Sequence, residues 1–196
     1  MHEANHIMMS VCLGIALSAC CGFRIFIPLL ATSIAVYNGW MDVSPDMQWM
    51  GGVPAIISFS TAAILEISAY YVPFLDNMLD FIAAPLAVIA GTLLAASLIP
   101  FPENEPLFRW GLGLLAGGAT AGTIQLGTGL IRIFSTKATV GAGNALIASA
   151  ENTVALTGTL LSFIIPVFMA ILLVLLVFWV LFRALRKVIR HEKRVF

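Results

Sequence analysis

The chain has 196 residues, of which 60% are hydrophobic and only 10% are charged, whereas soluble domains carry about 25% charged residues. Its apolar runs reach about 20 residues, the length that crosses the roughly 30 Å hydrocarbon core of a bilayer. This composition excludes a soluble domain, and it predicts an all-α, polytopic bundle of transmembrane helices.

The formal net charge is zero, but the basic residues are unevenly distributed along the chain. Six of the ten lie close to the C-terminus: Arg183, Arg186, Lys187, Arg190, Lys193 and Arg194. A basic segment directly after a membrane helix is typical of the cytoplasmic side. We therefore expect one transmembrane helical domain over residues 1–182, a basic cytoplasmic tail over residues 183–196, and a multi-pass location in the cell inner (plasma) membrane.

The lipid bilayer is then the main expected partner. Anionic lipid head groups are expected at the basic tail, and a homo-oligomer is a further candidate, since small bundles with a glycine-rich face often associate. Nucleic acid is not expected as a partner. No cofactor is predicted, because Cys12, Cys20 and Cys21 form neither a CxxC pair nor a Cys/His cluster.

The first apolar segment, residues 7–37, is long for a single span, and Gly22, Arg24 and Pro28 interrupt it. Proline removes a backbone donor and glycine weakens a helix, so a kinked or broken helix is predicted, with a hairpin of two short pieces as the alternative. The following residues, 38–52, contain Trp40 and Trp49 and are typical of an interfacial loop with aromatic anchors.

Four further apolar segments follow, giving about five spans. They cover residues 53–72, 81–99, 107–134 and 153–182. The third of these is rich in glycine, and its pairs Gly113/Gly117 and Gly118/Gly122 predict close helix packing. Residues 135–152 are too polar to cross lipid unaided, which favours a loop that re-enters the protein near 138–152, with a helix beginning near Asn144 or Ser149.

Five spans place the two ends of the chain on opposite sides of the membrane. With the C-terminus in the cytoplasm, residues 73–80 and 135–152 are expected to lie together on the outer side, opposite the basic tail. This placement would bring the polar residues of the two connections into one region of the bundle.

Carboxylates are concentrated in one stretch, residues 65–85, which contains Glu66, Asp76 and Asp80. A charged group at the centre of a bilayer costs about 2.5–3.5 kcal/mol on insertion scales, so a proton, a cation or an arginine must offset it. Asp76 and Asp80 are four residues apart, which places them on one face of a helical turn. Glu66 lies within a predicted span and is the strongest candidate for a buried proton or cation site.

Several of these motifs, in this order, resemble a bacterial membrane protein family called domain of unknown function 4126. The resemblance covers nearly the whole chain. It rests on GFRIFIPLL at 22–30, on LEISAYYVPFLDNMLD at 65–80, and on a later set: Arg132, Ser135, Thr136, Gly141, Asn144, Glu151 and Asn152. Asn152 stands where the family usually has Asp, and Tyr70 and Tyr71 occupy places that are often more polar. The resemblance implies a membrane-protein fold and no established chemistry.

The polar residues at membrane depth favour a small transporter or channel-like protein with a buried acidic site for protons, cations or a small solute. The expected ligands are Glu66, Asp76, Asp80, Asn144, Glu151 and Asn152, and the balancing charges are Arg24 and Arg132. Carboxylate oxygens without His or Cys suit protons and hard cations better than zinc or copper. An anion held by Arg24, Arg132 and Lys137 is the alternative cargo.

Two other classes of protein stay open. A structural or assembly protein would use arginine–carboxylate pairs as ties between helices. An enzyme is less favoured, because all three His residues are terminal and no GxSxG, HExxH, P-loop or Rossmann pattern occurs. A carboxylate-metal hydrolase acting on lipids is the form that such an enzyme would take.

Overall fold

The computed structural model describes residues 2–100, 105–139 and 142–192, with side chains except at residues 2–3, 73–74, 76–77, 80, 184–185 and 187–192. Within these ranges every regular element is a helix. The elements are α1 (His2–Cys21), α2 (Phe26–Tyr37), η1 (Pro45–Gly51), α3 (Val53–Ala69), α4 (Pro73–Leu98), α5 (Pro106–Gly113), η2 (Leu114–Gly118), α6 (Ala119–Thr139), α7 (Asn144–Ile164) and α8 (Pro166–Glu192).

Five of these helices are long and apolar enough to cross a membrane: α1, α4, α7, α8, and the continuous helix formed by α5, η2 and α6. Helices η1 and α3, which are bent by 62° relative to each other, are together also long and apolar enough to cross a membrane and form a sixth candidate span. The predicted polytopic all-α bundle is therefore confirmed, and the protein is a multi-pass membrane protein.

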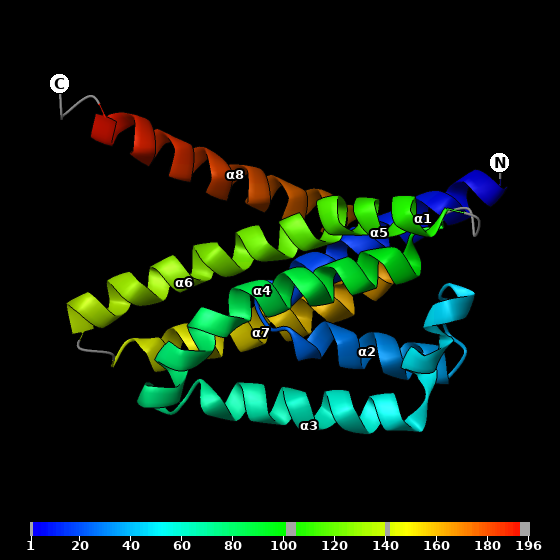
Figure 1. Ribbon diagram of the computed structural model, residues 1–196, viewed down its shortest axis with the longest axis horizontal. Helices are drawn as coiled ribbons and strands as arrows, with labels where there is room; N and C mark the ends of the chain where they lie inside the picture. The colour runs from blue at the N-terminus through cyan, green and yellow to red at the C-terminus, as the bar shows by residue number, and fades with distance from the viewer. Residues whose placement is uncertain (1, 101–104, 140–141, 193–196) are drawn as a thin grey trace.

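The first apolar segment is broken, as predicted, and its two pieces form a hairpin (Figure 1). Gly14 of α1 lies against Leu98, at the end of α4, and the hydroxyl of Ser18 donates to the carbonyl of Gly91, 2.8 Å away. Helix α1 therefore runs antiparallel to α4. Helix α2 returns to the end from which α1 started, where Ser33 donates a hydrogen bond to the carbonyl of Met50 in η1.

The hairpin tip lies at the middle of the bundle rather than at its end. A Cβ on Gly22 would be 2.6 Å from both the carbonyl oxygen of Ala121 and the Cβ of Ile124. These two residues are at the midpoint of the 34-residue helix formed by Pro106–Thr139. The hairpin therefore enters the bundle from one end and turns back at about half its depth.

The predicted glycine contacts are present between α4 and the α5–η2–α6 helix. A Cβ on Gly91 would be 2.6 Å from the carbonyl oxygen of Gly117, and one on Gly122 would be 2.7 Å from Val88. Gly113 and Gly118 face the same helix, α4. Small residues let the two helix backbones approach each other closely. The same helix, through Ala121 and Ile124, also contacts the hairpin tip at Gly22.

The last apolar segment is not one span, which corrects the topology expected from the sequence. It contains the end of α7 and the start of α8, which reverse direction at Ile165 and Pro166 (Figure 1). Residues 144–152 form the first turns of α7, so of the two predicted helix starts Asn144 is the observed one. The loop predicted to re-enter the protein near 138–152 is wrong, because α6 continues to Thr139 and α7 already begins at Asn144. Because of the extra reversal, α8 finishes at the end of the bundle where α4 begins, α6 ends and α7 begins, and not at the opposite end.

Candidate functional site

The hairpin tip is formed by a short turn between α1 and α2. The backbone N–H groups of Gly22 and Phe23 donate to the carbonyls of Ala19 and Cys20, at 3.0 Å in both cases, and so end α1. Only glycine fits at position 22, because α6 approaches the backbone there so closely. The turn therefore places the next side chain, Arg24, inside the bundle.

Arg24 has no exposed surface, and its guanidinium group is hydrogen-bonded in several directions. Nη1 lies 2.7 Å from Oε2 of Glu151 and 3.0 Å from the carbonyl oxygen of Phe23. Nη2 donates to the carbonyl of Ala148 at 3.2 Å, and Nε donates to Oδ1 of Asn152. One arginine thus joins the hairpin tip to α7.

A second buried arginine meets the same carboxylate. Arg132 of α6 is 1% exposed, and its Nη2 forms an ion pair with Oε2 of Glu151, the oxygen that Arg24 also contacts. Both guanidinium groups stack on the buried ring of Tyr70, with their central carbons 4.0 Å (Arg24) and 4.1 Å (Arg132) from the ring centroid. The other oxygen of Glu151, Oε1, is buried and has no hydrogen-bond partner among the described residues.

The second buried carboxylate, Glu66, is directed to the backbone of the hairpin. Its Oε1 accepts a hydrogen bond from the N–H of Ile25 at 2.9 Å, and its Oε2 accepts one from Phe26 at 3.1 Å. These are N–H groups at the start of α2, where a helix lacks partners for its donors and favours negative charge. Glu66 therefore caps α2, although 40 residues separate it from Phe26.

Together, two arginines and two glutamates form a compact buried cluster with no formal net charge. The cluster joins four parts of the protein: the hairpin tip, α3, α6 and α7. It lies between the midpoint of the bundle and the end at which α6 finishes. The side chains of the cluster are joined by ion pairs and hydrogen bonds, which is the arrangement that buried titratable groups require.

The structure brings five of the eight predicted site residues together, shows Asn144 apart from them, and does not describe the side chains of the other two. Arg24, Glu66, Arg132, Glu151 and Asn152 meet at the hairpin tip. Asn144 is two helical turns before Glu151, about 10 Å along α7, and its Nδ2 donates to the hydroxyl of Thr136 at 2.9 Å. The side chains of Asp76 and Asp80, in the first turns of α4, lie outside the described residues.

Two tyrosines belong to the site although the sequence analysis gave them no role. Tyr70 holds both guanidinium groups, and the hydroxyl of Tyr71 lies 2.9 Å from that of Ser149 and accepts from Nδ2 of Asn152 at 3.3 Å. The signal for Tyr70 is its position four residues after Glu66, which puts both on one face of α3. An aromatic residue in an apolar helix gives no further indication of an arginine partner.

An apolar groove between α3 and α4 ends at the cluster. Its volume is about 270 Å³, and Phe26, Leu65 and Leu86 are among the side chains that line it. Glu66 and Tyr70 also line the groove and are its contact with the charged cluster. The groove therefore connects the apolar flank of the bundle to the back of the site.

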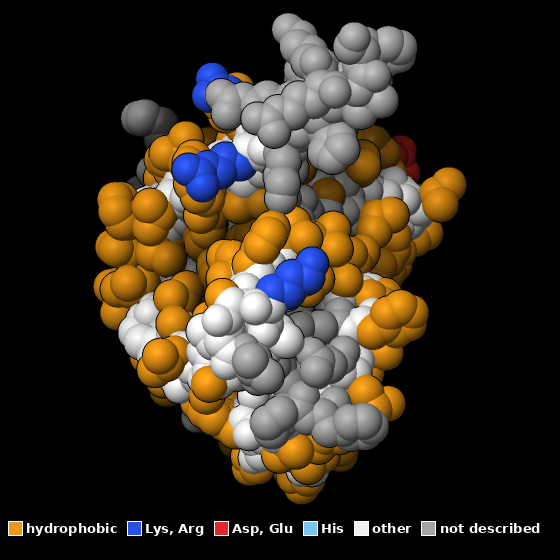
Figure 2. Space-filling view, turned by 90° about the vertical axis from the view of Figure 1, so that its left-hand side faces the viewer, with side chains coloured by type: hydrophobic (Ala, Val, Ile, Leu, Met, Phe, Trp, Pro, Cys, Tyr) orange, Lys and Arg blue, Asp and Glu red, His pale blue; other side chains and the backbone are white. Residues whose placement is uncertain are grey.

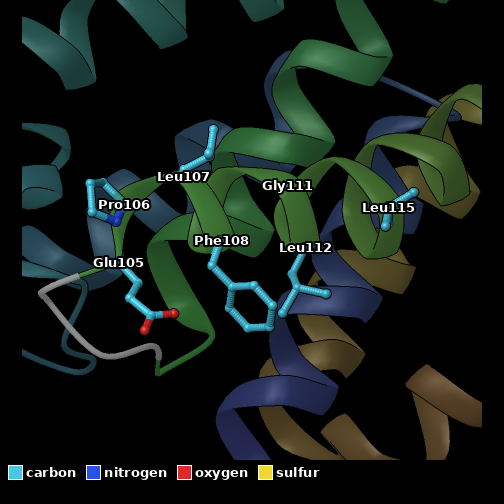
Figure 3. Close-up of a pocket in the computed structure, with 7 residues that line it drawn as sticks. All are labelled: Glu105, Pro106, Leu107, Phe108, Gly111, Leu112 and Leu115. Atoms are coloured by element: carbon cyan, nitrogen blue, oxygen red, sulfur yellow. The ribbon is translucent and has the colours of Figure 1, made fainter.

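A different hollow, of about 540 Å³, runs along α5 at the opposite end of the bundle, where Phe108 and Leu112 point to the same side (Figure 3). Near this hollow, Arg109 forms a bidentate ion pair with Asp46 of η1. That hydrogen bond lowers the pKa of Asp46 below its usual value. The Asp46 side chain is 53% exposed whereas that of Arg109 is 10% exposed, so the pair lies at the rim of the bundle and joins η1 to α5.

Among the residues that the structure describes, no three His, Cys, Asp or Glu side chains are grouped so that they could hold a metal ion. No curated protein and no solved structure matches the chain. One family model matches residues 11–187, which is nearly the whole chain, and includes every residue of the buried cluster. The chain therefore belongs to the family described as domain of unknown function (DUF4126).

Proposed function

We propose that this protein is a small membrane transporter that moves a proton or a small solute past the buried cluster of Arg24, Glu66, Tyr70, Arg132 and Glu151. The observation that carries the proposal is Arg24, a fully buried charge at the tip of a hairpin that turns back at half depth. Broken helices with polar residues near the middle of the bilayer are a common way to build transport sites.

The energetic cost of the cluster supports a functional role. An arginine or carboxylate in the hydrocarbon region costs free energy, up to about 2.5–3.5 kcal/mol on insertion scales when it lies at the centre of the bilayer. Replacing a buried ion pair by apolar side chains of similar volume is often neutral or stabilising. Helix association alone therefore gives little reason to retain four charges at one place, whereas transport of a polar or charged solute does.

The contacts of the cluster favour some cargoes over others. Glu151 already faces two guanidinium groups, and Glu66 already accepts from two backbone N–H groups. A metal cation would have to compete with all four positive or donor groups. A proton on a carboxylate, or a solute that exchanges hydrogen bonds with the arginines, requires a smaller rearrangement.

Orientation in the inner membrane with a cytoplasmic C-terminus is part of the proposal. The end where α8 finishes carries Lys137, Arg183 and Arg186, the latter two in the last turns of α8, and basic side chains face the viewer at this end (Figure 2). The other end carries Asp42, Asp46 and Glu105. Positive charge marks the cytoplasmic side, and the same charges would attract anionic lipid head groups. Association into a homo-oligomer through exposed apolar helix faces is a further part of the proposal.

A structural or assembly role is the second candidate, and one observation favours it. The cluster physically joins the hairpin tip to α3, α6 and α7 through Glu66, Arg132 and Glu151. Such ties could fix the packing of four segments without any solute passing between them.

Ion and solute flux in proteoliposomes would separate the two candidates. The wild type would be compared with Glu151→Gln and Arg24→Gln, using a pH-sensitive dye inside the vesicles and varied solutes outside. Arg109→Gln is a matched control, because it also removes an arginine from an ion pair but lies at the other end of the bundle.

The transport proposal predicts flux in the wild type and in Arg109→Gln, and its loss in folded Arg24→Gln and Glu151→Gln. Folded wild type that carries no flux under any gradient would overturn the proposal. That result would favour the structural role, in which the cluster only ties helices together.

A further inference from the structure

We propose that the apolar groove between α3 and α4 binds an uncharged, lipid-soluble alcohol from the bilayer, a molecule with one apolar chain and a hydroxyl group that donates a hydrogen bond to Glu66. The site shares Glu66 with the charged cluster, but it does not depend on transport past that cluster. The proposal depends on where the groove opens, on its size, and on the carboxyl group in its wall.

The groove opens on the lipid-facing flank of the bundle. Leu65 of α3 is 63% exposed and Ile82 of α4 is 50% exposed, and both line the groove. The groove lies close to the connection between the two helices, since α3 ends at Ala69 and α4 begins at Pro73. A molecule dissolved in the bilayer can therefore enter the groove from the side, without leaving the hydrocarbon.

Small side chains create the space in the groove. Ala62 and Ala69 line it from α3 and Ala83 lines it from α4. Positions 62, 66 and 69 are four and three residues apart, which places them on one face of α3. The volume of about 270 Å³ is enough for about nine groups of the size of a water molecule, at about 30 Å³ each. A single apolar chain fits both this volume and the apolar wall.

Glu66 gives the groove a polar contact. It is the one carboxyl group among the described residues that line the groove. Its two oxygens each accept one backbone N–H, from Ile25 and Phe26, and these two residues line the groove as well. A carboxylate oxygen has two lone-pair sites, so each oxygen can accept a second hydrogen bond. An acceptor in an apolar wall favours a ligand that donates a hydrogen bond at this place.

The neighbouring arginines select against a cation as that donor. Their guanidinium carbons lie 4.0 Å (Arg24) and 4.1 Å (Arg132) from the ring centroid of Tyr70, which lines the groove beside Glu66. An ammonium group at Glu66 would be close to these like charges, and a charged head group would also lose its hydration in the groove. An uncharged hydroxyl group donates a hydrogen bond without either cost.

Photochemical labelling tests the site in the full chain, reconstituted into phosphatidylcholine nanodiscs. The probe is decanol with a diazirine on its chain, which loses nitrogen on illumination and gives a carbene that inserts into neighbouring side chains. Mass spectrometry then locates the labelled residues. We expect label on Leu65, Leu79, Ile82 and Leu86, which line the groove, and we expect unlabelled decanol to displace it.

Decyl methyl ether tests the hydrogen bond, because it has the same chain and an oxygen but no donor. Equal displacement should need about fivefold more ether than decanol, or a larger excess, which is the effect of one hydrogen bond. In Glu66→Gln this preference for the alcohol should fall. The amide has a single acceptor oxygen, for which the N–H groups of Ile25 and Phe26 already compete.

A substitution that fills the groove tests its position. Ala62→Phe places a large ring among the lining residues and should abolish the displaceable label. Thr61→Phe is the matched control, because Thr61 is the adjacent residue, is exposed and does not line the groove. This control should keep the label. If Ala62→Phe does not fold, the comparison of decanol with its ether on the wild type decides the question.

Three results would overturn the proposal. If decanol displaces no label from the groove residues of the wild type, the groove does not bind the alcohol. If the ether displaces the label as well as decanol does, Glu66 does not recognise a donor. If folded Ala62→Phe keeps a displaceable label, the bound molecule lies elsewhere. Each of these results leaves the flux experiment on the cluster to be decided by its own outcome.

Discussion

The carboxylate of Glu66, in α3, accepts hydrogen bonds from the backbone N–H groups of Ile25 and Phe26, at 2.9 and 3.1 Å, and so caps a helix to which it is not adjacent in sequence. This contact fixes the N-terminus of α2 against the end of α3. The geometry of the hairpin tip, and with it the position of Arg24, therefore depends on a side chain from a later helix.

Glu66→Ala is expected to destabilise the protein by about 1–3 kcal/mol, because it leaves two buried backbone donors without their acceptor. Glu66→Gln keeps one acceptor oxygen and should lose less. The measurement is the unfolding free energy in detergent. Glu105→Ala is the control, since Glu105 is also at the start of a helix, α5, but makes no side-chain capping bond. Equal losses at the two positions would contradict the capping role.

Gly22→Ala should destabilise the protein, because a side chain at position 22 would clash with α6 at the hairpin tip. The new Cβ would be 2.6 Å from the carbonyl oxygen of Ala121, which belongs to backbone and cannot rotate away. Forcing atoms into a packed site typically costs about 1–3 kcal/mol.

The control for this substitution is Gly111→Ala, where a Cβ would meet nothing within 4 Å. Alanine favours a helix over glycine by about 0.5–1 kcal/mol, so this variant should be as stable as the wild type or slightly more stable. Thermal unfolding of the two variants side by side measures the difference. If Gly22→Ala unfolds at the same temperature as the wild type, α6 does not approach the hairpin tip as closely as described.

Much of the fold follows from local sequence patterns. Long apolar runs predict the spans, the interruption at Gly22 and Arg24 predicts the broken first helix, and the small-residue pairs predict close packing against another helix, which is α4 in the structure. The reversal between α7 and α8 was missed, because its residues Ile165 and Pro166 do not interrupt the apolar composition. Pro166 was the available signal, since proline is favoured in the first turn of a helix.

The site was predictable as a set of residues but not as a geometry. Charges in an apolar chain must find partners, so Arg24, Arg132 and Glu151 could be named together. Which carboxylate meets which arginine depends on contacts between residues more than 100 positions apart along the chain, as for Arg24 and Glu151. The backbone capping by Glu66 and the stacking on Tyr70 depend on the same long-range packing, for which a single sequence gives no pattern.

The ion pair of Asp46 and Arg109 should make stability depend on pH. Its hydrogen bond lowers the pKa of Asp46 in the folded protein, so the contribution is complete above the ordinary aspartate pKa of about 3.9 and is lost as the pH falls through the lowered value. Asp46→Asn should therefore be less stable than the wild type at neutral pH, and the difference should disappear in acid.

The measurement for this pair is the unfolding midpoint of both proteins in detergent across that pH range. High salt should reduce the difference at neutral pH, because Asp46 is exposed to solvent and exposed ion pairs are screened. A difference that persists unchanged at acid pH would show that the substitution acts through packing and not through loss of charge. Arg109→Gln is a suitable control in the flux experiment because it removes a largely buried arginine from an ion pair that lies far from the cluster.

The order of the helices predicts which connections share a side of the membrane. Single cysteines would be placed at Gln48, Lys137 and Arg183, in a background in which Cys12, Cys20 and Cys21 are replaced by alanine. With a membrane-impermeant maleimide on intact cells, Lys137→Cys and Arg183→Cys should behave alike, and Gln48→Cys should behave in the opposite way. If the C-terminus is cytoplasmic as proposed, only Gln48→Cys reacts from outside.

The comparison of Lys137 with Arg183 tests the reversal between α7 and α8 directly. One continuous span over residues 153–182 would place these two positions on opposite sides, whereas two antiparallel helices place them on the same side. The comparison of Gln48 with Lys137 tests the three crossings that lie between them, which are α3, α4 and the α5–η2–α6 helix. Because the buried cluster is built from the end of α3 (Glu66) and from α6 (Arg132), labelling that put Gln48 and Lys137 on one side would contradict the helix arrangement that brings these residues together.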